Sequence, residues 1–169
     1  MPYVIDTNVF VEAKRRYYAF DLCPGFWDAL CWQQGAGAIF SIDRVRKEIE
    51  DGADDLTTWV KDVMPVACFA DTTTSDVAQQ YAGAINWVTA NPDFTDAAKA
   101  EFATVDRADA WVVAFAKAKG HTVVTHEVLR PGAKSRVPIP NVCQALGVPF
   151  IDTFDMLRAL GTQFSWLAP

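Results

Sequence analysis

The sequence predicts an α/β fold in which helices cover a mostly parallel β-sheet. Short apolar and β-branched runs, at residues 2–5, 38–41, 122–125 and 148–151, alternate with longer stretches of helical periodicity. Such alternation is typical of βαβ units, in which a helix returns the chain to begin the next parallel strand. With 169 residues, 51% of them apolar, the chain can build one well-buried domain but not two comfortable ones. We therefore predict a single domain over 1–169.

The first strand stops abruptly at an acid. Tyr3-Val4-Ile5 is followed by Asp6, Thr7 and Asn8. In an open parallel sheet the ligand crevice lies beyond the carboxyl ends of the strands, so an acid in this position faces a ligand or a metal. The alternative is that Asp6 only caps the next helix, since Asp is among the commonest N-cap residues.

The second strand leads into a helix that carries an acid on its apolar side. Val45 and Ile49 share one face, and Glu48 lies one turn beyond Val45. This spacing directs the carboxylate toward the crevice. As a single observation, Glu48 could equally be a solvated helix acid.

Residues 54–104 are predicted to form a helical insertion that ends near Asn91-Pro92. Only Ala67-Cys68-Phe69 has the character of a strand there. Helical spacing covers residues 76–89, with apolar positions at Val77, Tyr81, Ile85 and Val88.

A small, apolar helix over residues 106–116 begins with two acids one turn apart. These are Asp106 and Asp109, and the segment after Asp109 is too apolar for a surface helix. Taken alone, Asp109 could be an acid that only stabilises a helix start. The strand at 122–125 again ends near an acid, Glu127. Its neighbour His126 is interpreted as an ordinary loop histidine.

Glycines mark the expected helix ends, and an irregular loop follows Glu127. Gly52, Gly120 and Gly147 each stand where a helical pattern stops. Prolines and a glycine between 131 and 140 indicate a loop that forms a rim to the site.

Four acids therefore fall at element ends, and their chemistry favours a metal site. Crowded carboxylates destabilise a fold unless protons or cations neutralise them. Mg²⁺ and Mn²⁺ prefer oxygen ligands, and two such ions about 3.5 to 4 Å apart assist an in-line phosphodiester displacement. We expect one or two Mg²⁺ or Mn²⁺ ions and phosphodiester hydrolysis, with ligands Asp6, Glu48, Asp109 and Glu127. Asn8 and Thr125 would orient the ligands or hold a metal-bound water.

The net charge of −6 argues against a nucleic-acid partner until the acids that would hold metal are set aside. Basic residues come in two groups, after the first and the last acidic motif. The candidates for phosphate binding are Arg15, Arg16, Arg130, Lys134 and Arg136. The alternative is that both groups are solvated.

The sequence also argues against other classes of protein. No apolar run is long enough to span a bilayer, and the amino terminus lacks the pattern of a secretory signal, so a soluble cytoplasmic protein without a membrane partner is expected. The four cysteines show no CxxC spacing and only two histidines are present, which argues against structural zinc. Reduced cysteines are expected.

The ordered set of acidic motifs resembles that of PIN-domain nucleases. It is carried by Ile5-Asp6-Thr7-Asn8, by Ser41 with Val45 and Glu48, by Asp109 within residues 108–114, and by Val124-Thr125-His126-Glu127. Residues 15–18, 23–27 and 137–158 further resemble a bacterial PIN subgroup of uncharacterised function, so the likeness covers essentially the whole chain. It implies a three-layer α/β/α domain. It also implies a Mg²⁺- or Mn²⁺-dependent endoribonuclease, the toxin of a type II toxin–antitoxin pair.

Two departures from the PIN pattern concern individual residues. The last motif more commonly carries aspartate, and Glu127 reaches one methylene further, which means an adjusted metal geometry or a weak second site. Glu48 fits the motif better than its neighbour Glu50. Asp106 is interpreted as a helix-start acid that assists Asp109.

The expected partners are an RNA substrate and a cognate antitoxin protein, and the sequence leaves room for a homodimer. The alternatives are a non-catalytic interaction protein of the same fold and a phosphatase-like α/β enzyme. A dehalogenase-type phosphatase would need an acid two residues after Asp6. Asn8 stands there and cannot act as a general acid.

Overall fold

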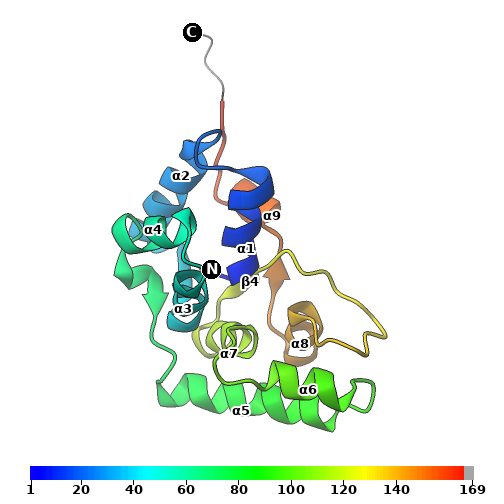
Figure 1. Ribbon diagram of the computed structural model, residues 1–169. Coiled ribbons are helices and arrows are strands. Elements are labelled where there is room, and N and C mark those ends of the chain that lie inside the picture. Colours follow the sequence, from blue (N-terminus) through cyan, green and yellow to red (C-terminus); the bar gives the residue numbers. More distant parts are fainter. Residues whose placement is uncertain (166–169) are drawn as a thin grey trace.

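A five-stranded sheet in the order β3-β2-β1-β4-β5 forms the centre of the computed structural model, which describes residues 1–165 (Figure 1). All neighbouring strands are parallel. The strands are β1 (Tyr3–Ile5), β2 (Ile39–Ile42), β3 (Phe69–Ala70), β4 (Thr122–Val124) and β5 (Phe150–Ile151). The predicted α/β class and parallel sheet are confirmed.

Helices cover both faces of the sheet and complete three layers. The chain steps outward from β1 to β2 and β3, then returns to the other side of β1 for β4 and β5. Right-handed crossovers consequently place the helices of the two halves on opposite faces. One group comprises α1 (Thr7–Glu12), α2 (Pro24–Gly35), α3 (Asp43–Asp51) and α4 (Asp55–Asp62). The other comprises α5 (Ser75–Ala90), α6 (Asp96–Phe102), α7 (Asp109–Lys119) and α8 (Ile139–Leu146). Figure 1 shows α5–α8 together, opposite α1, α2 and α4.

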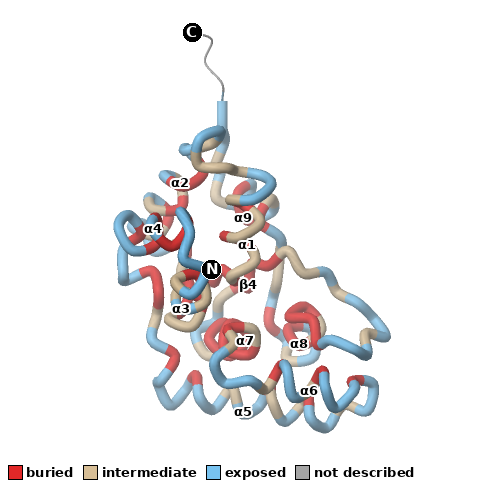
Figure 2. The backbone as a smooth tube through the Cα atoms, viewed as in Figure 1, coloured by how far each residue is buried: buried red, intermediate tan, exposed pale blue. Residues whose placement is uncertain are grey.

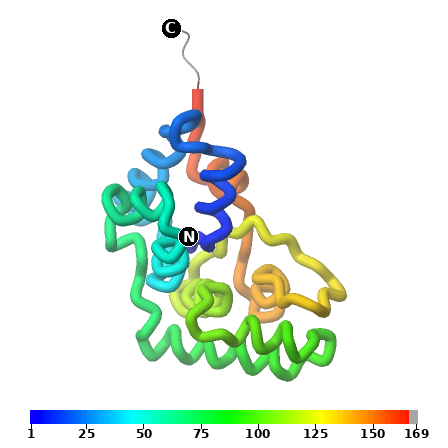
Figure 3. Tube along the Cα trace, viewed as in Figure 1, coloured from blue at the N-terminus to red at the C-terminus, as the bar shows by residue number. Residues whose placement is uncertain are grey.

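The order in which the chain adds strands to the sheet reverses between β1 and β4, and this switch point positions the site. β1 pairs with β2 on one side and with β4 on the other, with Val4 opposite Val123. In Figure 3 the blue start of the chain meets the yellow-green segment there. Where the strand order reverses, the helices diverge and leave a crevice at the carboxyl ends of the strands.

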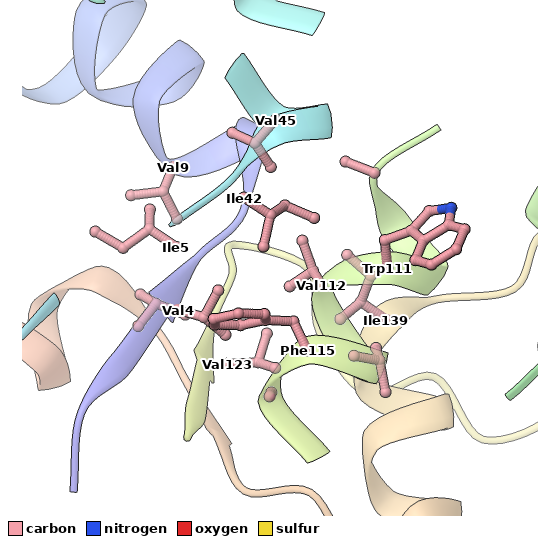
Figure 4. Close-up of a cluster of buried hydrophobic side chains, with 14 of the residues drawn as sticks. Val4, Ile5, Val9, Ile42, Val45, Trp111, Val112, Phe115, Val123 and Ile139 are labelled. Carbon is pink, nitrogen blue, oxygen red and sulfur yellow. The ribbon is translucent and has the colours of Figure 1, made fainter. Parts of the chain in front are cut away.

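α7 is the buried helix of the second group. Residues 110–116 are all buried, which explains why their sequence is too apolar for a surface helix (Figure 2). Val112 and Phe115 pack with Val4 and Val123 of the sheet (Figure 4). Each fully buried side chain of this kind contributes about 1.5 to 3 kcal/mol of transfer free energy. α5 covers the outer side of α7.

The predicted helical insertion also contains the edge strand of the sheet. Val66–Cys68 form a 3₁₀ turn (η2), and β3 begins at Phe69, later than the predicted strand at 67–69. A two-residue strand is too short to show alternation in the sequence. The helix predicted over 76–89 is α5, which ends just before Asn91-Pro92.

One predicted helix boundary is wrong. The helix expected from Asp106 begins at Asp109, and Asp106 lies in the preceding turn. Gly120 and Gly147 end their helices in the left-handed conformation, both at φ 68°, as predicted. Gly52 also follows the last residue of its helix, α3, as predicted, but its φ is −70°; Ala53 takes the positive value, φ 50°, immediately before the capping box of α4 at Asp54.

Two short segments complete the chain. α1 continues directly into a π-helix, η1 (Ala13–Tyr17), and α9 (Thr153–Ala159) follows β5. The four cysteines form no disulfide bond with one another. Over residues 1–165, helices that combine the length and the hydropathy needed to cross a bilayer are absent.

Two Gly→Ala substitutions are predicted to act in opposite directions. Gly83 lies within α5 with open space around its Cβ position, so Gly83→Ala should raise the free energy of unfolding by about 0.5 to 1 kcal/mol. Gly120 has positive φ, so Gly120→Ala should lower it by about 1 to 2 kcal/mol. Urea denaturation measures both. If both substitutions changed the free energy of unfolding in the same direction, the helix end assigned at Gly120 would be contradicted.

Candidate functional site

Asp6 is the most deeply buried acid of the site. It follows β1 directly, and its exposed fraction is 2%. Its Oδ1 accepts a hydrogen bond from the Thr7 amide at 2.7 Å, and its Oδ2 accepts one from Thr125 Oγ1 at 3.1 Å. Burial raises the pKa of Asp6 well above its usual value, and the charges of Asp109 and Glu127 raise it further. Asp6 is also the N-cap of α1, so the capping interpretation is confirmed, and capping leaves its second carboxylate oxygen to Thr125.

Asp109 is the first residue of α7, as a site residue should be if the helix points its N-terminus at the crevice. Burial raises its pKa to about 6, with a further contribution from the charge of Glu127. Arg107 and Arg136 act in the opposite direction. Among residues 1–165, no donor forms a hydrogen bond to the Asp109 carboxylate. Its oxygens thus remain available to a ligand.

Glu48 accepts hydrogen bonds from the starts of two helices, α1 and α7. Its Oε2 accepts a hydrogen bond from Thr7 Oγ1 at 2.5 Å, and its Oε1 accepts one from the Ala108 amide at 2.9 Å. These contacts place Glu48 beside Asp109, whose pKa it also raises. Glu48 is half-buried and held by Thr7 and Ala108, so it is not a solvated helix acid.

Glu127 faces the same crevice from the segment after β4. Its Oε2 accepts a hydrogen bond from the Ile139 amide at 2.7 Å, and its Oε1 forms an ion pair with the guanidinium of Arg136. The side chain of Glu127 is 14% exposed. The additional methylene, compared with aspartate, lets its carboxylate reach the start of α8.

Asn8 and Thr125 form the polar network predicted around these acids. Asn8 Nδ2 donates to Thr125 Oγ1 at 2.9 Å, and Asn8 Oδ1 accepts from the His126 amide at 3.0 Å. The Thr125 hydroxyl in turn donates to Asp6. The network fixes the Asp6 carboxylate relative to the segment that carries Glu127.

The types of donor fit a hard divalent cation. The charges of Asp109 and Glu127 raise the pKa of Asp6, and those of Glu127 and Glu48 raise the pKa of Asp109. Carboxylate oxygens are the donors that Mg²⁺ and Mn²⁺ prefer. However, no three acidic, histidine or cysteine side chains of residues 1–165 are already arranged around one point. Glu48 and Glu127 are held by their own hydrogen bonds, so rotation of these side chains would be needed to complete a ligand set.

A cleft of about 600 Å³ opens beside Asn8 and Glu127. Four of the predicted phosphate-binding residues line it, from both basic groups: Arg16, Arg130, Lys134 and Arg136. The second basic group therefore lines the cleft as a whole, whereas the first group contributes only Arg16. Arg15 does not line the cleft and is exposed, so its assignment to the substrate site is not supported.

Asp106 is also outside the site. Its carboxylate is 78% exposed and pairs with Lys47 at 3.4 Å. The prediction that it assists Asp109 is wrong because the helix begins three residues later than expected, which leaves Asp106 in a surface turn.

Several further residues shape the site, and they carried no functional signal in the sequence or only a weak one. The carbonyl of Val105, in the turn before Asp109, accepts hydrogen bonds from Arg44 at 2.8 Å and from Trp111 Nε1 at 3.1 Å. The guanidinium of Arg44 also lies 4.1 Å from the Trp111 ring centre, and Tyr81 stacks on that ring. Thr7 had a sequence signal, because it stands within the first acidic motif. Arg44 had none.

The chain belongs to the family described as a domain of unknown function, DUF4411, whose profile matches residues 3–164. No curated protein and no solved structure matched the chain. The match covers every residue of the acid cluster.

The raised pKa of Asp109 predicts how stability depends on pH without divalent metal. The folded chain holds the Asp109 proton up to about pH 6, whereas the unfolded chain loses it near 3.8. The folded state is therefore penalised progressively as pH rises from about 4, and fully above about 6. Asp109→Asn removes this penalty. The free energy of unfolding of the variant should therefore exceed that of wild type by an amount that grows with pH and reaches up to about 3 kcal/mol at neutral pH.

Urea denaturation in EDTA at about pH 4.5 and pH 7.5 measures this difference. Asp106→Asn is the matched control, since its carboxylate is exposed, and should show no such gain. An Asp109→Asn advantage that stays constant with pH would contradict the burial of this carboxylate among other acids.

Proposed function

We propose that this chain is a divalent-metal-dependent endoribonuclease with a PIN-like domain. The observation that carries the proposal is the meeting of Asp6 and Asp109 at the switch point of a parallel sheet. Both pKa values are raised there, by burial and by neighbouring acids. A fold that gathers acids in this way is stabilised by a cation at that point.

Asp6, Asp109, Glu48 and Glu127 would hold one or two Mg²⁺ or Mn²⁺ ions. Such an ion, when bound, supplies Lewis-acid stabilisation of a phosphoryl oxygen and lowers the pKa of water. Thr125 and Asn8 keep the Asp6 carboxylate oriented. Arg136 reaches from the cleft to Glu127, so its guanidinium is placed to contact a phosphate next to the acids.

The cleft supports a polyanionic substrate. Arg16, Arg130 and Lys134 line it together with Glu127, and their charges suit the phosphates that flank a scissile bond. The acids would perform the cleavage and the cations would position the chain. This separation resolves the conflict between a net charge of −6 and a nucleic-acid substrate.

The biological role proposed is that of a cytoplasmic toxin in a type II toxin–antitoxin pair, with a cognate antitoxin protein as partner. It is supported by the resemblance of the acidic motifs to PIN-domain toxins.

A non-catalytic interaction protein of the same fold is the second candidate. It is favoured by the ion pair of Arg136 with Glu127, which already neutralises one of the four acids. The phosphatase alternative gains no support, because the Asn8 amide is fully engaged with Thr125 and His126.

Cleavage of RNA is the first test. With Mn²⁺ the wild-type chain should cut single-stranded RNA, and Asp6→Asn or Asp109→Asn should lower the rate by at least about 100-fold, because each removes a charged metal ligand. Gel analysis of a labelled RNA gives the rates, and circular dichroism checks the fold.

Asp106→Asn is the control for Asp109→Asn, with the same change of side chain three residues earlier. It should cleave at the wild-type rate. A wild-type chain that leaves RNA, DNA and phosphomonoesters intact would favour the interaction protein instead.

The cleft should determine how RNA binding depends on salt. Replacing Arg130 and Lys134 together with alanine should reduce the slope of log K against log salt concentration by about 1.4, since each phosphate contact with a single strand contributes about 0.7. Fluorescence anisotropy between about 50 and 200 mM salt measures the slope. Arg15→Ala, outside the cleft, should leave it unchanged, and an equal loss in Arg15→Ala would contradict the assigned path.

A further inference from the structure

Three aromatic rings form an open platform at the edge of the cleft, which we call the aromatic platform: Tyr17, His126 and Phe154. Tyr17 is 50% exposed, and with His126 it lines the cleft. The ring centres of Tyr17 and His126 are 5.6 Å apart, and those of Tyr17 and Phe154 are 5.5 Å apart with the planes at 84°. An apolar ring this exposed, held by two neighbours, is a surface prepared for a ligand.

The backbone around Tyr17 directs its ring outward. η1 is a π-helix, closed by a hydrogen bond from the Tyr18 amide to the Ala13 carbonyl at 2.6 Å. The next ring, Tyr18, points inward and stacks on Phe26 with ring centres 4.2 Å apart. The π-helix therefore separates two adjacent tyrosines, one into the core and one to the cleft. Segments of this type are frequent at functional sites.

His126 and Phe154 fix the platform from the other side. His126 Nε2 lies 3.1 Å from Thr153 Oγ1, and the His126 amide is bound by Asn8 Oδ1. Phe154 belongs to α9, and its ring centre lies 6.1 Å from that of His126. The platform is thus assembled from three distant parts of the sequence around the same network that orients Asp6.

The neighbours of the platform show what kind of ligand fits. Arg16, Tyr17, His126 and Glu127 all line the cleft, so the rings share it with a cation and with one acid of the cluster. A flat apolar group joined to an anionic chain would place its ring on Tyr17 and its charge on the cations. A nucleotide has this combination, since every base presents a π-face next to a phosphate.

We propose that the aromatic platform stacks on one unpaired base of the RNA, so that the site takes single-stranded and not duplex substrate. The proposal rests on the proposed function, in which the phosphates of the strand follow the cleft. In a duplex both faces of a base are covered by its neighbours, whereas a single-stranded base can be splayed out onto an aromatic side chain. Stacking does not distinguish the four bases, so the platform selects strandedness and not sequence.

Binding of an eight-nucleotide fluorescein-labelled RNA in EDTA tests the platform without cleavage. Each nucleotide in turn is replaced by an abasic residue, and affinity is measured by anisotropy. For the wild-type chain, one position should weaken binding about 10-fold when its base is removed. Tyr17→Leu should bind the intact RNA about 10-fold more weakly and show no sensitive position, whereas Tyr17→Trp should keep it.

Trp32→Leu is the matched control, because Trp32 is 69% exposed but does not line the cleft. It should bind as wild type does. A duplex of the same sequence should bind wild type and Tyr17→Leu equally. If Trp32→Leu loses affinity and Tyr17→Leu does not, or if duplex and single strand bind wild type alike, the platform proposal is overturned.

The outcomes separate this proposal from the proposed function. A wild-type chain that cuts RNA with Mn²⁺ but has no position sensitive to base removal is a nuclease without a stacking subsite. A chain with a position that depends on Tyr17, but with no cleavage, binds single strands through the platform and is not a nuclease. A wild-type chain that binds no RNA overturns the platform as well.

Discussion

A buried carboxylate without a cationic partner is the constraint around which this protein is organised. Asp6 lies at the end of the central strand with almost no exposure, and no Lys or Arg of residues 1–165 forms an ion pair with it. An ionised acid in such a place is costly unless a proton, a cation or several hydrogen bonds compensate it. The two hydrogen bonds from Thr7 and Thr125 lower the pKa of Asp6, but they do not outweigh its burial among other acids.

The surrounding elements can be understood as supports for this charge. The switch point of the sheet requires Asp6 and Thr125 to be neighbours, because β1 and β4 pair in register. α7 is buried on almost every side, and so its first residue, Asp109, is carried into the crevice by packing and not by its own polar contacts. Thr7 links Asp6 to Glu48, because its amide donates a hydrogen bond to Asp6 and its hydroxyl donates one to Glu48.

The sequence revealed those parts of the site that depend on local pattern. Asp6 and Glu127 could be predicted because a β-branched run stops before each, and Glu48 because its helical face is apolar. Asp106 could not be separated from Asp109 by spacing alone, since both fit a helix start; only the turn held by Arg44 and Val105 decides between them. Gly52 stands at the end of α3 as its pattern indicated, but the sequence did not show that the positive φ falls on Ala53, next to the cap of the following helix.

The aromatic platform lay beyond sequence reasoning for a different reason. Tyr17 and Tyr18 are adjacent and chemically identical, and a π-helix sends one to the cleft and the other to the core. His126 had only the appearance of a loop histidine until Phe154 and Thr153 were seen beside it. Such residues acquire their role from distant parts of the chain, which no local periodicity records.

The most direct measurement of the central claim is the anomalous diffraction of crystals grown with Mn²⁺. We expect a manganese peak within bonding distance, about 2.0 to 2.3 Å, of carboxylate oxygens from both Asp6 and Asp109, with Glu48 or Glu127 rotated toward it. A crystal structure in which Asp6 and Asp109 point away from each other, or in which manganese binds elsewhere and leaves both acids untouched, would contradict the account.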